Sequence, residues 1–278
     1  MHAGLPTGSL DGPILVLAPH YDDEILGCCR LLEGVADRSG IRVVFACDGR
    51  GSAEFDLVRT GETGDGGDLR AAESFAALAL LGVPPSAVQR LEFPDGALAE
   101  RGPELAAALE RIAGELKPRW ILAPFRFDRH PDHVALARAA LSLPAVRDGR
   151  SRLLEYFVYY RFRFFPGRDI RRVVRPDWLL AAGPPADPSL KRRALACFTS
   201  QVTLYYDGQD RPVLTPAFLD EVAAGQEQFL AAPPAAGDAD VLRWPPFLVR
   251  LIMAAEHRLK RKAYAWRTWL KRRHKDGG

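Results

Sequence analysis

The stretch Ile14-Leu15-Val16-Leu17-Ala18-Pro19-His20-Tyr21-Asp22-Asp23-Glu24 decides the fold of this chain. Its first five residues form a short apolar run rich in branched aliphatic side chains, which is typical of a buried strand. The run leads directly into a histidine and two adjacent aspartates, which are groups that bind metals or move protons. In open α/β sheets, ligands bind beyond the carboxyl ends of the strands. The stretch therefore predicts an α/β fold with its chemistry after this first strand.

Apolar runs and amphipathic segments alternate along the first 150 residues. We predict strands at 13–18, 41–47, 88–93 and 119–124, and helices at 22–39, 69–81, 103–116 and 134–142. This alternation indicates a mostly parallel sheet with helices on both faces. Beyond residue 150 the pattern is weaker, and we predict strands at 153–165 and 178–182 and helices at 188–200 and 217–231. The Gly- and Asp-rich segment 48–68 shows no clear period and is interpreted as a functional loop.

Charge is distributed unevenly along the chain. The 278 residues carry a net charge of +3, but residues 243–278 alone carry +9, which leaves −6 for the rest. A mildly acidic body with a basic tail is not the charge distribution of a nucleic-acid-binding domain. We therefore expect no nucleic-acid partner.

The cysteines and the amino terminus indicate a cytoplasmic protein. The four cysteines include no CxxC pair, and the adjacent Cys28 and Cys29 are poorly placed for an ordinary disulfide. Residues 1–12 lack the basic and apolar regions of a signal peptide. No apolar run reaches the length of about 18 residues that a membrane-spanning helix needs.

A second group of histidines follows the predicted strand 119–124. His130 and His133 lie there, spaced by three residues. Since parallel strands end at the same edge of a sheet, His133 is expected to lie near His20 and Asp23. Two imidazoles and one carboxylate are the usual protein ligands of catalytic zinc. The same set also binds Fe(II) in oxygenases, so residue type alone leaves zinc and iron open.

The remaining groups have the chemistry of a hydrolase. Asp22 lies beside a predicted ligand and is a natural general base for water. His130 is expected to point into the same pocket, where it could stabilise an oxyanion or protonate a leaving amine. Either motif alone is often only a helix cap or a surface feature, but both follow buried strands. The protein could also be a sugar- or nucleotide-binding module that is not an enzyme. The presence of all five site groups argues against this alternative: His20, Asp22, Asp23, His130 and His133.

The motifs resemble those of the PIG-L/LmbE-like deacetylases. Pro19-His20-Tyr21-Asp22-Asp23-Glu24 resembles the PHPDDE motif of that family, with Tyr21 where proline is usual, and His130-Pro131-Asp132-His133 resembles its second motif. The likeness continues through 47–49, 69–73, 94–96 and 191–201, and so covers about residues 10–230.

The resemblance implies a Rossmann-like, zinc-dependent hydrolase that removes acetyl groups from N-acetylated amino sugars such as N-acetylglucosamine in glycoconjugates. It implies that His20, Asp23 and His133 bind the metal, that Asp22 is the general base, and that His130 stabilises the oxyanion. It further implies substrate contacts by Arg70, Asp95 and Asp128.

The tail is predicted to be a basic amphipathic helix. We expect a deacetylase domain over residues 1–232, a linker at 233–242 and a C-terminal helix over 243–278. Within 246–275, apolar residues recur at steps of three and four, and basic residues fill much of the rest. Such a helix packs on the body or on a second subunit of a homo-oligomer, binds an acidic polymer, or lies on a membrane. In the last case the protein would be peripheral at the inner face of the membrane, with a lipid-linked sugar as substrate.

Overall fold

The computed structural model describes residues 10–50, 66–158, 169–184, 187–205, 209–252, 254–255 and 258. Several predictions fall partly or wholly outside these residues. They are the absence of a signal peptide at the first residues, most of the functional loop 48–68, the second half of the aromatic strand 153–165, and most of the C-terminal helix.

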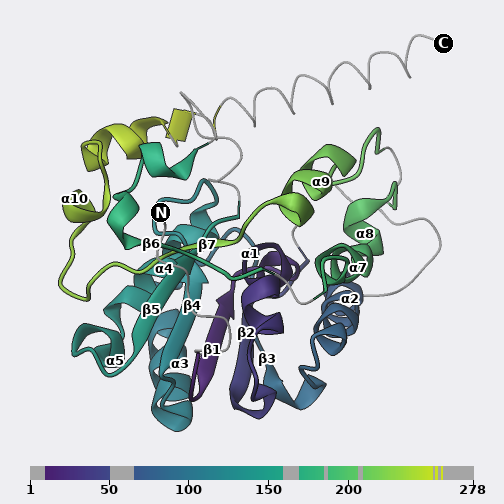
Figure 1. Ribbon diagram of the computed structural model, residues 1–278, viewed down its shortest axis with the longest axis horizontal. Coiled ribbons are helices and arrows are strands. Elements are labelled where there is room, and N and C mark those ends of the chain that lie inside the picture. The colour runs from purple at the N-terminus through teal and green to yellow at the C-terminus, as the bar shows by residue number, and fades with distance from the viewer. Residues whose placement is uncertain are drawn as a thin grey trace.

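In the described part of the chain, seven strands form one sheet in the order β3-β2-β1-β4-β5-β7-β6 (Figure 1). The strands are β1 (Ile14–Ala18), β2 (Ile41–Cys47), β3 (Val88–Phe93), β4 (Trp120–Pro124), β5 (Arg152–Tyr156), β6 (Leu179–Ala181) and β7 (Gln228–Leu230). Neighbours among β1 to β5 are parallel, whereas β7 runs antiparallel to β5 and β6. The predicted mostly parallel α/β sheet is confirmed.

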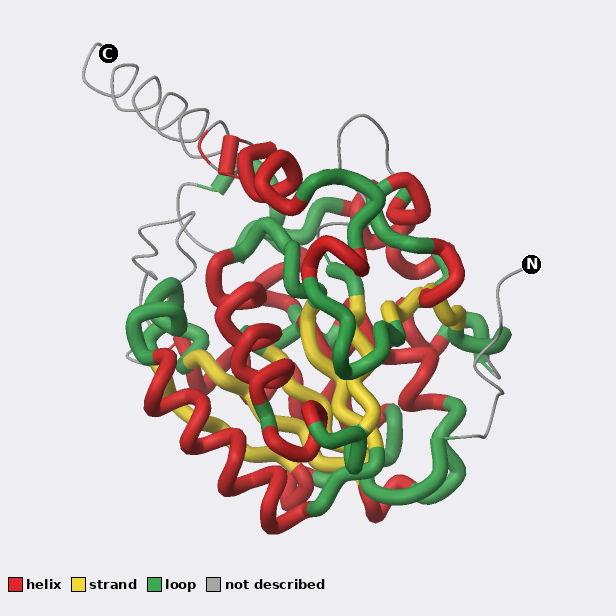
Figure 2. Tube along the Cα trace, turned by 90° about the vertical axis from the view of Figure 1, so that its left-hand side faces the viewer, coloured by secondary structure: helices red, strands yellow, loops and turns green. Residues whose placement is uncertain are grey.

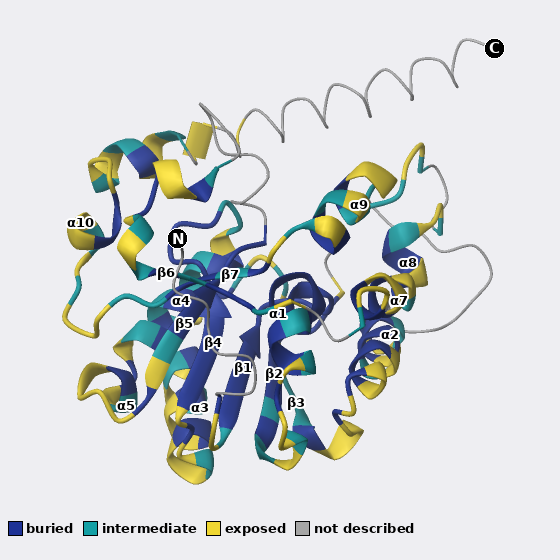
Figure 3. Cartoon of the chain, in the orientation of Figure 1, coloured by how far each residue is buried: buried dark blue, intermediate teal, exposed yellow. Residues whose placement is uncertain are grey.

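Helices cover both faces of this sheet, as the sequence pattern predicts. One face carries α1 (Asp23–Glu33), α2 (Gly66–Leu80), α7 (Leu190–Ala196) and α9 (Pro216–Ala224), and the other carries α3 (Gly102–Leu116), α4 (Pro131–Ser142) and α5 (Pro144–Arg147). Successive side chains of a strand point to opposite faces, so Val16 and Leu17 of β1 enter different cores. Figure 2 shows the helices around the sheet, and Figure 3 shows that β1, β2 and β4 are buried between them, whereas the edge strand β3 is partly exposed.

The chain after β5 differs from prediction in several places. The predicted helix 188–200 is divided into α7 and α8 (Thr199–Val202). The predicted helix 217–231 ends at Ala224, because Gly225 has extended backbone, and residues 228–230 form strand β7 instead. The predicted linker 233–242 packs on the body: it contains α10 (Asp238–Val241), and Leu242 forms a β-bridge with Val174. Together with Phe125, Phe127 and Phe157, this segment builds a third apolar cluster beyond the carboxyl ends of β4 and β5.

The site lies where the strand order reverses. The chain runs from β1 outward to β2 and β3 on one side, then returns to β4 and β5 on the other. β1 and β4 are neighbours, with Val16 opposite Leu122, so their carboxyl ends open the crevice in which such sheets bind ligands. Among the helices of the described residues, none has the length and apolarity to span a membrane.

Candidate active site

The loop after β1 places His20 and Asp23 in this crevice. Both residues are buried, and Nδ1 of His20 lies 3.2 Å from Oδ2 of Asp23. The backbone N–H of His20 donates to the same carboxylate oxygen. Asp23 is the first residue of α1, where the helix dipole favours a negative charge.

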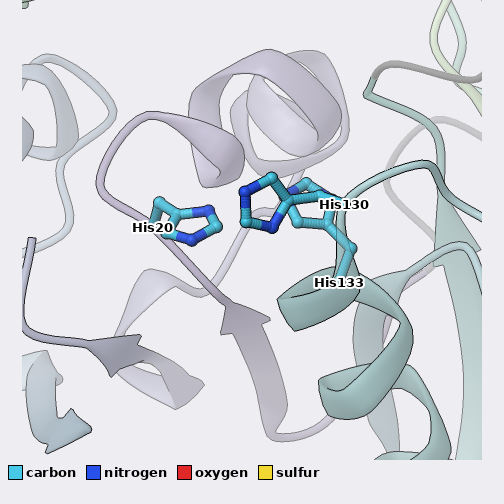
Figure 4. Close-up of side chains that lie close together, drawn as sticks. All are labelled: His20, His130 and His133. Carbon is cyan, nitrogen blue, oxygen red and sulfur yellow. The ribbon is translucent and has the colours of Figure 1, made fainter. Parts of the chain in front are cut away.

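The loop after β4 and the start of α4 bring the other two histidines to the same place. Nε2 of His133 lies 3.2 Å from Oδ2 of Asp23, so this oxygen lies between two imidazoles. The ring of His130 meets that of His20 edge-on at 4.6 Å between centroids. Figure 4 shows His20 on one side and His130 and His133 on the other. One nitrogen of each ring lies within 4.8 Å of those of the other two. The two motifs predicted to converge lie together.

These groups fit a bound cation. Oδ1 of Asp23 is buried and has no hydrogen-bond partner within the described ranges. Burial opposes protonation of His133, yet Asp23 and Asp128 raise the pKa of its ring to about 9. Burial likewise opposes protonation of His20, and its carboxylate partners Asp132 and Asp23 raise its pKa above the usual value. Surroundings that attract two protons this strongly also attract a divalent cation to the same nitrogens.

A second layer of carboxylates holds the histidine rings. Oδ2 of Asp132 lies 3.2 Å from Nε2 of His20, and Oδ2 of Asp128 lies 3.5 Å from Nδ1 of His133. Each imidazole therefore has one nitrogen toward Asp23 and the other toward a supporting carboxylate, as metal-binding histidines usually do. Asp132 has no role in the sequence prediction, although it lies within the second motif. Asp128 was predicted as a substrate contact, and the structure buries it against His133.

Asp22 is held in a strained backbone conformation. Its φ of 117° lies in the left-handed region, which is costly for a residue with a Cβ atom. Its backbone N–H donates to Glu24, whose carboxylate in turn accepts from the hydroxyl of Ser74 at 2.6 Å. Its side chain lies 3.3 Å from the guanidinium of Arg70. Burial raises the pKa of Asp22 to about 7, against the opposing effect of Arg70.

His130 is the most exposed of the three rings, with 33% of its side chain accessible. It caps α4, because its Nδ1 accepts from the backbone N–H of Asp132. This leaves Nε2 to carry the proton and to act as a donor. Burial and the nearby His20 and His133 lower the pKa of His130 to about 3, which favours a neutral ring.

The structure also explains Tyr21, which replaces the usual proline. Its buried ring packs on Phe45 at 4.5 Å between centroids, and it fills the space that a side chain at Gly49 would need. Its carbonyl accepts from Arg70, which thereby spans Tyr21 and Asp22. Of the other predicted substrate contacts, Asp95 lies half-buried in the turn after β3 and close to His20.

Fold and site together are those of an α/β hydrolase with a candidate metal site. Residues 15–143 match the model of the PIG-L family, described as GlcNAc-PI de-N-acetylase. This segment contains both motifs and all three histidines, and it is similar to the PIG-L family of deacetylases. No curated protein matches the sequence significantly.

Several solved structures share the fold. The A40926 pseudoaglycone deacetylase Dbv21 is 24% identical over 81% of this chain and 99% of that chain, with a TM-score of 0.54. The N,N'-diacetylchitobiose deacetylase from Pyrococcus horikoshii is 19% identical over 83% and 87%, with a TM-score of 0.55. The zinc-inhibited form of the teicoplanin deacetylase Orf2 is 18% identical over 69% and 85%, with a TM-score of 0.51. At these identities the likeness is one of fold.

Proposed function

We propose that this protein is a zinc-dependent N-deacetylase that hydrolyses the acetamide of an amino sugar or glycoconjugate. The observation that carries the proposal is the convergence of His20, Asp23 and His133 beside Asp22 at the switch point of the sheet. The family match supports the reaction. The names of similar structures, a diacetylchitobiose deacetylase and a pseudoaglycone deacetylase, support an acetylated amino sugar as the substrate class.

His20, Asp23 and His133 would hold the cation. Once bound, a zinc ion would lower the pKa of a water molecule and polarise the amide carbonyl. Asp22, whose pKa of about 7 suits a proton acceptor near neutral pH, would take a proton from the attacking water. It would then pass that proton to the leaving amine, so that water and amide give acetate and a free amino sugar. Nε2–H of His130 would donate to the developing oxyanion.

The experiment that tests this proposal measures acetate release from a panel of N-acetylated amino sugars. Asp22→Ala should lose turnover by about 10² to 10⁴-fold, the usual contribution of a general base, while its zinc content stays that of the wild type. Asp68→Ala is the matched control, because Asp68 is an exposed carboxylate at the start of α2. An Asp22→Ala enzyme with full activity removes Asp22 from the mechanism. Iron in place of zinc in protein purified without added metal supports the oxygenase alternative.

We also propose that the C-terminal segment contacts an anionic membrane surface, which would favour a lipid-linked substrate. Three large apolar side chains near its start are exposed: Trp244 by 41%, Phe247 by 71% and Leu251 by 63%. The exposed Arg243 and Arg250 lie among them. The helix itself is anchored to the body by the buried Val249. An apolar patch flanked by guanidiniums is suited to the interface of an acidic bilayer.

A further inference from the structure

Cys47 lies beside the proposed metal site but belongs to neither histidine motif. It is the last residue of β2, and the register between β2 and β3 shifts between Phe45 and Cys47. Its backbone N–H donates to the carbonyl of Pro19 at 2.9 Å, which fixes it next to His20. Irregularities of this kind re-aim side chains near active sites.

Cys47 takes part in a second cluster of metal-binding atoms. Its Sγ, a ring nitrogen of His20 and a carboxylate oxygen of Asp95 lie within 4.8 Å of one another. Asp132 adds a fourth donor, with Oδ2 3.7 Å from Sγ of Cys47 and 3.2 Å from Nε2 of His20. In a tetrahedral zinc site, bonds of about 2.3 Å to sulfur and 2.0 Å to nitrogen or oxygen place neighbouring donors about 3.3–3.5 Å apart. Both observed separations are close to that spacing.

We propose that Cys47, His20, Asp95 and Asp132 form a second cation site, which takes a thiophilic divalent ion such as zinc or cadmium and blocks the substrate. A thiolate with an imidazole selects such ions over magnesium or calcium. The two sites use different nitrogens of His20, because Nδ1 faces Asp23 whereas Nε2 faces Asp132. The half-buried Asp95 gives the ion a path from solvent.

The second site is the weaker one. To fill it, the thiol of Cys47 must release its proton to solvent, and His20 must bind through a nitrogen that otherwise faces a carboxylate. With the first site occupied, His20 must also give up its remaining ring proton. The second ion therefore binds only when metal is in excess. Because Asp95 is expected to contact sugar hydroxyls, an ion there competes with substrate, and this kinetic consequence rests on the proposed function.

Cadmium binding tests the site without any need for activity. Cadmium is titrated into full-length protein that already holds one equivalent of zinc, and the thiolate-to-cadmium charge-transfer absorption is recorded in the ultraviolet. The wild type should show a band that saturates, and Cys47→Ser should lack it. Cys28→Ser is the matched control, because Cys28 is equally buried but lies within the apolar core under α1. Cys47→Ala replaces the serine variant if circular dichroism shows that the latter is unfolded.

Two outcomes of the titration overturn the proposal: a band of equal strength in a folded Cys47 variant, or no band in the wild type at saturating cadmium. The kinetic arm measures deacetylation with increasing zinc. Excess zinc should raise KM of the wild type and leave kcat unchanged, and Cys47→Ser should need roughly tenfold more zinc for the same inhibition. Equal inhibition of both enzymes contradicts the blocking role. If no substrate is deacetylated, the proposed function fails, and the cadmium band still decides the second site.

Discussion

Replacing Asp132 with asparagine tests whether this buried carboxylate orients a metal ligand. Oδ2 of Asp132 accepts from the backbone N–H of Gly96 at 2.7 Å and lies 3.2 Å from Nε2 of His20. Oδ1 accepts from the backbone N–H of Leu98 at 3.2 Å. The residue is fully buried, so water cannot take over any of these contacts.

The expected magnitude follows from the number of acceptors. An asparagine keeps only one oxygen, so whichever way the amide points, its NH₂ group meets an N–H donor. One buried N–H is then left unpaired, which costs about 1–3 kcal/mol of unfolding free energy. His20 also loses a charged partner, and loss of such a partner weakens metal affinity by about 10–100-fold. Asp132→Asn should therefore be both less stable and a weaker metal binder.

Zinc affinity is measured by competition with a chelator, and stability by urea unfolding. Asp148→Asn is the control, because Asp148 is an exposed carboxylate that pairs with Arg150 at the surface. Its loss should leave both stability and zinc affinity close to those of the wild type, because ion pairs at the surface contribute little. An Asp132→Asn protein with the zinc affinity of the wild type would refute the reasoning, since Asp132 would then support only the turn at Gly96.

Three further predictions concern stability, membrane contact and the metal. Lys191→Met should lower the unfolding free energy, measured in urea, by about 3–5 kcal/mol. The reason is that the buried carboxylate of Glu227, which Lys191 contacts at 2.6 Å, is left without its charged partner. Arg192→Ala is the control, because it breaks an exposed ion pair and should cost less than about 1 kcal/mol. Phe247→Glu should reduce co-sedimentation with anionic vesicles severalfold and leave hydrolysis of a soluble sugar unchanged; equal sedimentation contradicts the membrane proposal. Removal of metal by a chelator should abolish deacetylation and added zinc should restore it, whereas activity that survives chelation excludes a metal-dependent reaction.

The first strand and its motif could be predicted because their signals are local. The run 14–18 is continuous and apolar, and His20 and Asp23 follow it directly. The helix after it was predicted at 22–39 but spans Asp23–Glu33. Asp22 lies outside because its backbone is left-handed, and the end was overestimated because a separate short 3-10 helix follows at Arg38–Gly40.

Tertiary contacts explain what the sequence pattern missed. Asp132 supports His20 across 112 residues, and only the parallel pairing of β1 with β4 brings them together. Cys47 lies beside the same ring because β1 and β2 pair in parallel with Ala18 opposite Phe45, and hydrophobic periodicity does not reveal which strands are neighbours. Strand β7 has only three residues, and its pairing with β5 and β6 defines it as a strand. Its own sequence is equally compatible with the end of a helix.

The balance of charge in the site explains why the strain at Asp22 is retained. The carboxylates of Asp23, Asp128 and Asp132 all face the rings of His20 and His133, and each has a lowered pKa despite burial that acts to raise it. A fourth carboxylate, that of Asp22 with its left-handed backbone, lies against Arg70.

The pKa of Asp22 is raised by the same burial, and no imidazole contacts it closely enough to reverse that effect. Two adjacent aspartates thus differ in backbone conformation and in the direction in which their pKa values are shifted. Asp23 remains an anion that suits a cation, and Asp22 exchanges its proton near neutral pH. A substitution that relaxes φ at position 22, such as Asp22→Gly, removes both the strain and the carboxylate. It should therefore abolish turnover and be more stable than Asp22→Ala, which loses the same contact with Arg70 but keeps the left-handed backbone. Urea unfolding and acetate release measure both properties on the same sample.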